Sequence, residues 1–155
     1  MQLDRFLGPE RRSPRKAISY LYGTIVKSTR SEKEIRIECA FEKPFNDFYK
    51  RTITYQSNDH LFTVEDLFAK DTPDIHTYFH LDQGLSTHVK EGCVCIHKNG
   101  KEIAQCIFPD HLSLKVEPGW ISKSYGKKEA SVILHFTWNA VAHQPLLFTF
   151  KSIHQ

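Results

Sequence analysis

Hydrophobic and polar residues alternate with a period of two along most of the chain after residue 16. In DIHTYFHL, residues 74–81, Ile75 and Phe79 fall on one side of an extended chain, while His76 and Tyr78 fall on the other. Such alternation predicts a β-strand with one face buried and one face exposed to water. The polar face of this strand is either a candidate binding surface or simply the solvated side of a half-buried sheet.

Similar segments recur at regular spacing and are separated by Gly, Asn, Asp and Ser turn residues. No long window carries an apolar stripe with helical period, and the short candidate at 64–70 is better interpreted as a strand followed by a turn. We therefore expect an all-β fold of one domain, an antiparallel β-sandwich of nine to eleven strands with an open edge. The expected strands are 17–26, 35–41, 49–55, 61–68, 74–81, 93–98, 101–107, 112–117, 131–138 and 146–153.

Composition agrees with an ordinary globular protein. The 155 residues are 40% hydrophobic and 25% charged, and eleven Phe against one Met favour strands. A net charge of +3 is too small to indicate a nucleic-acid partner. No apolar run is long enough to cross a bilayer, and the N-terminus lacks the apolar core of a signal peptide. We expect a soluble chain that carries no export signal of its own and does not bind membranes.

The N-terminal residues 1–16 differ from the rest, because they show no alternation and carry the basic cluster ERRSPRK. We expect them to be a loose basic segment ahead of a single sandwich domain at 17–155. Arginine side chains match carboxylate and sulfate groups, so the cluster is either a polyanion contact or a solvated tail.

Two cysteines flank a predicted hairpin. CVCIHKNGKEIAQCI turns on Asn99–Gly100, a pair typical of two-residue β-hairpins. Counting outward from the turn sets Cys93 opposite Cys106, where a disulfide would be within reach. The alternative is a pair of small core residues, which we favour because free cysteine is commonly buried.

Two longer motifs resemble one known family. They are YKRTITYQSNDHLFTVEDLFAKDTPDIHTYFHL at 49–81 and VEPGWISKSYGKKEASVILHF at 116–136. The first looks like an Arg-centred strand, a strand ending in an acidic residue and a strand ending in His-Leu. The second is similar to a G-W-x-S-x-S-Y-G-x-K-E pattern. Both occur in the sandwich region of heparinase II/III-like polysaccharide lyases.

The resemblance implies the C-terminal β-sandwich of a larger lyase, whose helical toroid domain would be a partner and is absent from this chain. Such lyases act on acidic, uronic-acid-containing polysaccharides, with the acid/base Tyr on the toroid. The family also commonly has His two residues before Arg51, where this chain has Tyr49. We therefore expect no lyase activity from this chain alone, and the residues give no catalytic set.

The resemblance also implies a structural zinc in some members, with Asp66 and His80 at matching positions. A third ligand is lost, and His76 would lie roughly 13 Å from His80 along an ideal strand. Zinc suits His and Asp ligands. The alternative is that Asp66 closes a turn and His80 is hydrogen-bonded near the surface.

Carbohydrate binding is the second implied role. The candidate residues are Arg51, the polar-face residues His76 and Tyr78, and the pair Trp120 and Tyr125. An exposed Trp–Tyr platform beside lysines would suit an acidic sugar. The alternative, which we favour for that pair, is that the two aromatic residues are packing anchors at one end of the sandwich.

Three functional hypotheses follow. The first is a carbohydrate-associated module of a lyase, inactive alone. The second is an enzyme in its own right, although the sequence has neither a G-x-S-x-G elbow nor a P-loop. The third is a structural or protein-interaction sandwich that binds no glycan and forms homo-oligomers through its open sheet edges.

Overall fold

The fold is built from β-strands throughout the two ranges that the computed structural model describes, residues 22–42 and 48–153. β-Branched and aromatic residues with alternating polarity favour extended backbone, which explains why nearly every predicted segment is a strand. The strands are β1 (Tyr22–Arg30), β2 (Glu34–Glu42), β3 (Phe48–Gln56), β4 (Leu61–Phe68), β5 (Thr72–His80), β6 (Leu85–Lys90), β7 (Cys93–Lys98), β8 (Lys101–Ile107), β9 (Ser113–Ser124), β10 (Lys127–Ala140) and β11 (Leu146–Ser152).

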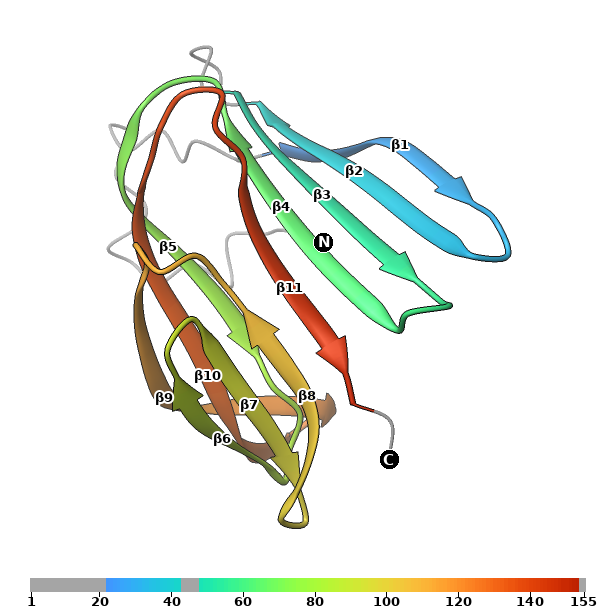
Figure 1. Cartoon of the computed structure of the whole chain (residues 1–155), viewed down its shortest axis with the longest axis vertical. Helices are drawn as coiled ribbons and strands as arrows, with labels where there is room; N and C mark the ends of the chain where they lie inside the picture. Colours follow the sequence, from blue (N-terminus) through green and yellow to red (C-terminus); the bar gives the residue numbers. More distant parts are fainter. Residues whose placement is uncertain (1–21, 43–47, 154–155) are drawn as a thin grey trace.

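The strands form two antiparallel sheets of unequal size (Figure 1). The larger has eight strands in the order β1-β2-β3-β4-β11-β8-β7-β6, and the smaller has three in the order β5-β10-β9. The last strand, β11, pairs with β4 on one side and with β8 on the other. The predicted all-β sandwich is confirmed, and residues 1–16, expected to be loose, lie outside the described ranges.

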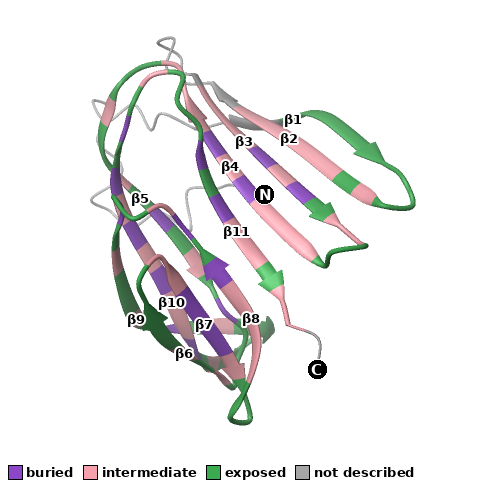
Figure 2. Cartoon of the chain, in the orientation of Figure 1, coloured by how far each residue is buried: buried purple, intermediate pink, exposed green. Residues whose placement is uncertain are grey.

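The core lies between the three-stranded sheet and the half of the larger sheet made of β4, β11, β8 and β7 (Figure 2). Its centre is aromatic: the rings of Phe79 and Phe136 each lie 4.9 Å from the ring of Phe148. Each such pair contributes about 0.5–1.5 kcal/mol beyond its area burial. Trp138, predicted to be a core residue, is buried and donates a hydrogen bond from Nε1 to Thr77 Oγ1 at 3.3 Å.

The larger sheet extends beyond its partner, so none of the described strands covers the inner face of β1, β2 and β3 (Figure 1). Register places Ile35, Ile53 and Tyr55 on the same side as the buried Val64, because directly paired residues share a face. The exposed fraction nevertheless rises to 38% at Ile35 and 37% at Tyr55. The apolar inner surface therefore continues past the edge of the core; we call it the β1–β3 inner face.

The predicted hairpin exists, but its register differs from the expectation. Asn99 and Gly100 have φ of 52° and 77°, as a two-residue hairpin turn requires. A bulge between Ile96 and His97 then shifts the pairing, so Val94 faces Cys106. Cys93 and Cys106 consequently lie on opposite faces of the sheet, and all four thiols are free. The derived register, with Cys93 opposite Cys106, is wrong, since an added residue inverts every later side chain. The favoured interpretation as small core residues holds for Cys106, which is fully buried, whereas Cys93 is only partly buried.

Strand β9 is longer than the sequence indicated. The expected strand ended at residue 117, yet β9 stays paired with β10 through Gly119 and Trp120. A Cβ at Gly119 would collide with the side chain of Ile133, so the glycine lets this Ile lie across the neighbouring strand. In addition, no strand was predicted at Leu85–Lys90, where β6 forms the edge of the larger sheet. The described residues contain no helix long and apolar enough to cross a membrane.

Candidate functional site

An ion pair between β3 and β4 contains two of the predicted site residues. Arg51 and Asp66 face each other in register, and the guanidinium donates to both carboxylate oxygens, from Nε at 2.6 Å and from Nη2 at 2.7 Å. The hydroxyl of Tyr49 donates to the same carboxylate at 2.7 Å. Tyr49, at the position where the resemblance led us to expect His, therefore donates a hydrogen bond to Asp66.

Burial governs the electrostatics of this cluster. Asp66 is 1% exposed, and the Arg51 side chain is 30% exposed. Burial and the charge of Asp66 raise the pKa of Tyr49 well above its ordinary value, so the phenol stays protonated. Burial lowers the pKa of Arg51, but the hydrogen bond and charge of Asp66 outweigh it and raise the value. The cluster is thus a fixed ion pair, and its Arg is held by Asp66.

The contacts of Asp66 oppose a role for this residue as a zinc ligand. Asp66 accepts three hydrogen bonds and lies against a guanidinium, which opposes the approach of a second cation. His80 ends β5, which belongs to the other sheet. Within the described ranges, no group of three or more His, Cys, Asp or Glu side chains is placed to hold a metal ion. The donor set at Asp66 does not fit zinc.

The outer face of the three-stranded sheet contains the predicted polar strand face. His76, Tyr78 and His80 are exposed on β5, whereas Thr77 and Leu81 are buried, so the alternation is as the sequence predicted. The pairing of β10 with β5 adds His135, whose ring stacks on that of Tyr78 with centroids 4.3 Å apart. We call these four residues, together with their carboxylate neighbours Asp74 and Glu117, the histidine face.

His135 is a functional candidate that the sequence reasoning missed. It lies in SVILHFTW between Leu134 and Phe136, both fully buried, so alternation alone places it on the outer face. Its position beside Tyr78 depends on the register of β10 against β5. That register pairs His135 with Tyr78, 57 residues earlier in the chain, and it could not be derived from local pattern.

Trp120 and Tyr125 lie at the β9–β10 hairpin and are not buried. Trp120 is 65% exposed, and Tyr125, in the turn, is fully exposed. The interpretation of the pair as packing anchors is therefore wrong for this chain. Trp120 pairs with Ala130, beyond the part of β10 that the core covers. Three lysines share the hairpin with the two aromatic residues: Lys123, Lys127 and Lys128.

The predicted sugar-binding residues thus lie in three separate places. Arg51 is in the ion pair of the larger sheet, His76 and Tyr78 are on the histidine face, and Trp120 and Tyr125 are at the β9–β10 hairpin. Register puts Trp120 on the same side of its sheet as the buried Leu134, which is the side opposite His135. A single cleft wall formed by all five residues is not present.

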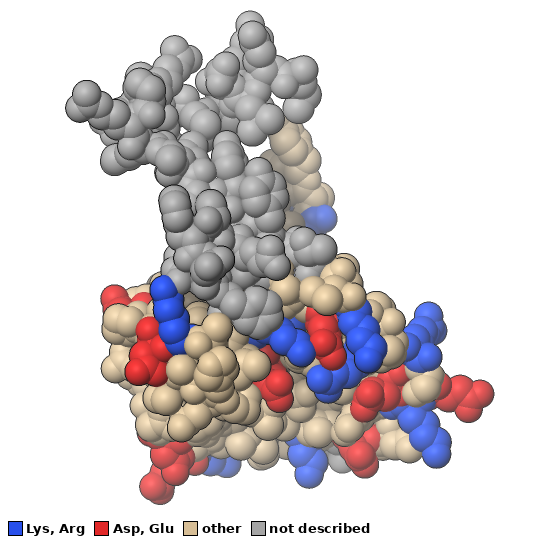
Figure 3. All heavy atoms as spheres, turned by 90° about the horizontal axis from the view of Figure 1, so that it is seen from above, with Lys and Arg blue, Asp and Glu red and all other residues tan. Residues whose placement is uncertain are grey.

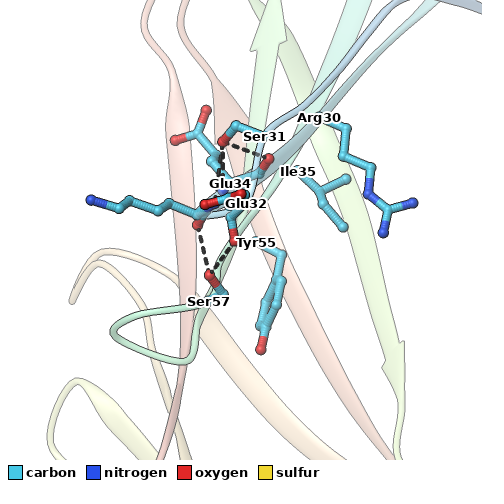
Figure 4. A pocket seen from close by; sticks show the side chains of 8 residues that line it. Arg30, Ser31, Glu32, Glu34, Ile35, Tyr55 and Ser57 are labelled. Atoms are coloured by element: carbon cyan, nitrogen blue, oxygen red, sulfur yellow. Dashed lines mark hydrogen bonds between the residues drawn. The ribbon is translucent and has the colours of Figure 1, made fainter.

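A pocket of about 520 Å³ lies where the β1–β2 turn meets the end of β3 (Figure 4). The Ser57 hydroxyl closes one side by donating to the carbonyl oxygens of Glu32 at 3.0 Å and Lys33 at 3.2 Å. Charges of both signs surround the opening, and Ile35 and Tyr55 form its apolar side. The pocket therefore adjoins the β1–β3 inner face. Its lining residues are Arg30, Ser31, Glu32, Lys33, Glu34, Ile35, Tyr55 and Ser57.

Solved structures share this arrangement of strands. The heparan sulfate lyase HepC from Pedobacter heparinus matches with a TM-score of 0.70 at 14% identity, over 86% of this chain and 22% of the lyase. The heparinase III product of BT4657 matches with a TM-score of 0.61 at 13% identity, over 84% of this chain and 21% of that protein. The TM-scores show a common fold, and at such low identity the likeness shows the fold alone. This chain spans about a fifth of the length of these lyases.

A search of curated proteins finds no match. The family model for the heparinase II/III-like C-terminal domain, in contrast, matches residues 4–149, which is nearly the whole chain. The match includes both motifs that carry the sequence resemblance, together with every strand from β1 to β10. The chain belongs to the family of heparinase II/III-like C-terminal domains.

Proposed function

We propose that this chain is a non-catalytic module of a heparinase II/III-like lyase and that it contacts acidic polysaccharide through the β9–β10 hairpin. The observation that carries the proposal is the exposure of Trp120 and Tyr125 beside three lysines. Aromatic faces stack on sugar rings, and ammonium groups meet carboxylate or sulfate. The solved relatives that are named as heparan sulfate lyases support this class of ligand.

The positive charge at the hairpin is local. Positive and negative side chains are interspersed over the described part of the face shown in Figure 3. Lys123 is paired with Asp82 at 2.7 Å, while Lys127 and Lys128 are exposed around the Gly126 turn. Lys127 and Lys128 are therefore the cations that we expect a glycan to meet.

The test is binding of the chain to heparan sulfate, heparin, hyaluronan, chondroitin and alginate at physiological salt. Trp120→Ala should weaken binding at least tenfold, and the double variant Lys127→Ala/Lys128→Ala should weaken it and flatten its salt dependence. Lys98→Ala/Lys101→Ala, at the exposed β7–β8 turn, is the matched control. Equal loss in both double variants would show that net charge alone attracts the glycan, which contradicts the proposal.

His76 and Tyr78 form a second proposed glycan contact, on the other side of the three-stranded sheet. Tyr78 is half-exposed, and one face of its ring stacks on His135, so a sugar would stack on the opposite face. Tyr78→Ala in the same assay separates this surface from the hairpin. A glycan that binds across both surfaces would have to wrap the sheet edge, so we expect one variant to matter far more than the other.

Catalysis is not part of the proposal. Mixing the chain with any of these polymers should give no unsaturated uronate product, detected by ultraviolet absorbance. Product formation by the purified chain would show that it is an enzyme in its own right.

The β1–β3 inner face supports a second role, as a docking surface for the rest of a lyase. Ile25 is 64% exposed and pairs with Cys39 of β2, on the same face as Ile35 and Tyr55. The matching lyases are about four times as long as this chain, so other domains are available to cover it. Alone, the chain should associate through this face, and Ile35→Asp should shift it to monomer in sedimentation. A monomeric wild type would argue against an unsatisfied face.

A further inference from the structure

Two imidazole rings approach each other on the histidine face. Nδ1 of His76, on β5, lies 2.7 Å from Nε2 of His135, on β10. Each ring nitrogen that faces away from the pair meets a carboxylate oxygen. Nε2 of His76 is 3.1 Å from Oδ1 of Asp74, and Nδ1 of His135 is 3.2 Å from Oε1 of Glu117.

These contacts fix the tautomers. An ionised carboxylate only accepts hydrogen bonds, so both outward nitrogens carry a proton. In the neutral rings, the two inward nitrogens then direct their lone pairs at each other across 2.7 Å. Such a contact is favourable only when a positive centre lies between them. Carboxylate–histidine pairs of this kind orient the ligands of bound metal ions in many proteins.

We propose that His76 and His135 form a binding site for a divalent transition-metal ion such as Zn²⁺ or Cu²⁺. Imidazole is a preferred ligand for both ions. Two nitrogens on one tetrahedral zinc, each at about 2.0–2.1 Å, are about 3.3 Å apart. To bind the ion, the rings therefore need to separate by about 0.6 Å and to turn until their lone pairs converge on it.

Access and charge favour the ion. The His76 side chain is 40% exposed and that of His135 is 15% exposed, so solvent reaches the site and water completes the coordination. Asp74 and Glu117 supply two negative charges, against the single positive charge of Lys115, which is bound to Glu117 at 2.8 Å. The pKa of Glu117 is lowered by Lys115 and then by His135, which keeps its carboxylate ionised.

The surrounding structure holds both rings in place. The Tyr78 ring stacks on His135 at an interplanar angle of 21°. Asp74 adopts φ of 54°, in the left-handed region, and its N–H donates to Oδ1 of Asn139 at 3.0 Å. Asp tolerates this conformation better than most residues, and it turns the carboxylate towards His76. This site lies on the opposite sheet from Asp66, and it stands whether or not the module binds glycan.

The test uses the whole chain after treatment with a chelator and dialysis. Titration calorimetry with Zn²⁺ should give one site that His76→Ala and His135→Ala each weaken at least tenfold. His80→Ala, an exposed histidine on the same strand face, should leave this site unchanged. Glu117→Gln should weaken it by a smaller factor. Circular dichroism without metal checks that each variant is folded.

A second measurement uses the wild-type chain, so it does not depend on whether the variants fold. On adding one equivalent of Zn²⁺, the side-chain ¹⁵N resonances of His76 and His135 should shift, and the spectrum of bound Cu²⁺ should show two nitrogen ligands. Zinc binding that survives both alanine variants, or shifts confined to other histidines, would overturn the proposal. So would a wild type that binds neither ion at millimolar concentration, since a shared proton alone would then join the rings.

Discussion

Replacing Arg51 with alanine should destabilise the sandwich more than replacing Asp66, although each change breaks the same ion pair. Asp66 is 1% exposed and the Arg51 side chain is 30% exposed. Loss of Arg51 leaves a carboxylate that water scarcely reaches, whereas loss of Asp66 leaves a guanidinium that reaches solvent. Removing one partner of a buried pair costs about 3–5 kcal/mol, and we expect Arg51→Ala in that range. Asp66→Ala should cost about 2 kcal/mol, a typical value for lost hydrogen bonds to a charged group.

Urea unfolding of the isolated chain, followed by tryptophan fluorescence and by circular dichroism, measures both changes. Arg51→Lys is the matched control, because it keeps the charge and loses the two-pronged contact, and it should fall between the two. The double variant Arg51→Met/Asp66→Leu should be more stable than Arg51→Ala, since no charge stays buried. The reasoning is refuted if Asp66→Ala costs more than Arg51→Ala, or if the double variant is the least stable of all.

Three further predictions concern single residues. Gly119→Ala should cost about 1–3 kcal/mol in the same unfolding assay, and adding Ile133→Ala should restore part of the loss, because the new methyl group collides with Ile133. Gly100→Ala should cost about 1 kcal/mol at φ of 77°, where its Cβ meets no neighbour, so a larger loss would contradict a purely backbone effect. Burial raises the pKa of the Cys106 thiol to about 12. An unfolded thiol has a pKa of about 8.5, so the folded state holds the Cys106 proton more tightly. The stability of the fold should therefore decrease as the pH rises from about 8.5 towards 12. Cys106→Ala should flatten that slope, and identical slopes in the two proteins would refute the assignment.

Local pattern was enough to identify the strands. Period-two alternation placed β4 at its observed bounds, and it put His76 and Tyr78 on the exposed side of β5. It failed at β6, where LSTHVK has few large apolar residues and forms only an edge of the sheet. Local pattern also missed the bulge beside Ile96. A bulge adds a residue to one strand of a pair, and the sequence of either strand by itself does not show this.

The candidate sites depended on long-range pairing, and the sequence could not supply it. The ion pair of Arg51 with Asp66 follows from the register of β3 and β4, although each residue stood out only through the family resemblance. Trp120 was expected to be buried because large aromatic residues usually are, but the strand carries it past the end of the core. His135 became a candidate only when β10 was placed beside β5.

The position of β11 determines the order in which the larger sheet can assemble. β1 to β4 form one meander of consecutive hairpins and β6 to β8 form another, and β11 is the strand that joins them. A ribosome releases β11 after all the other strands, so the two meanders emerge as separate ribbons with open edges at β4 and β8. The sheet can close only after synthesis has passed residue 152, and a nascent chain that stalls before Leu146 exposes both edges to chaperones and to other chains.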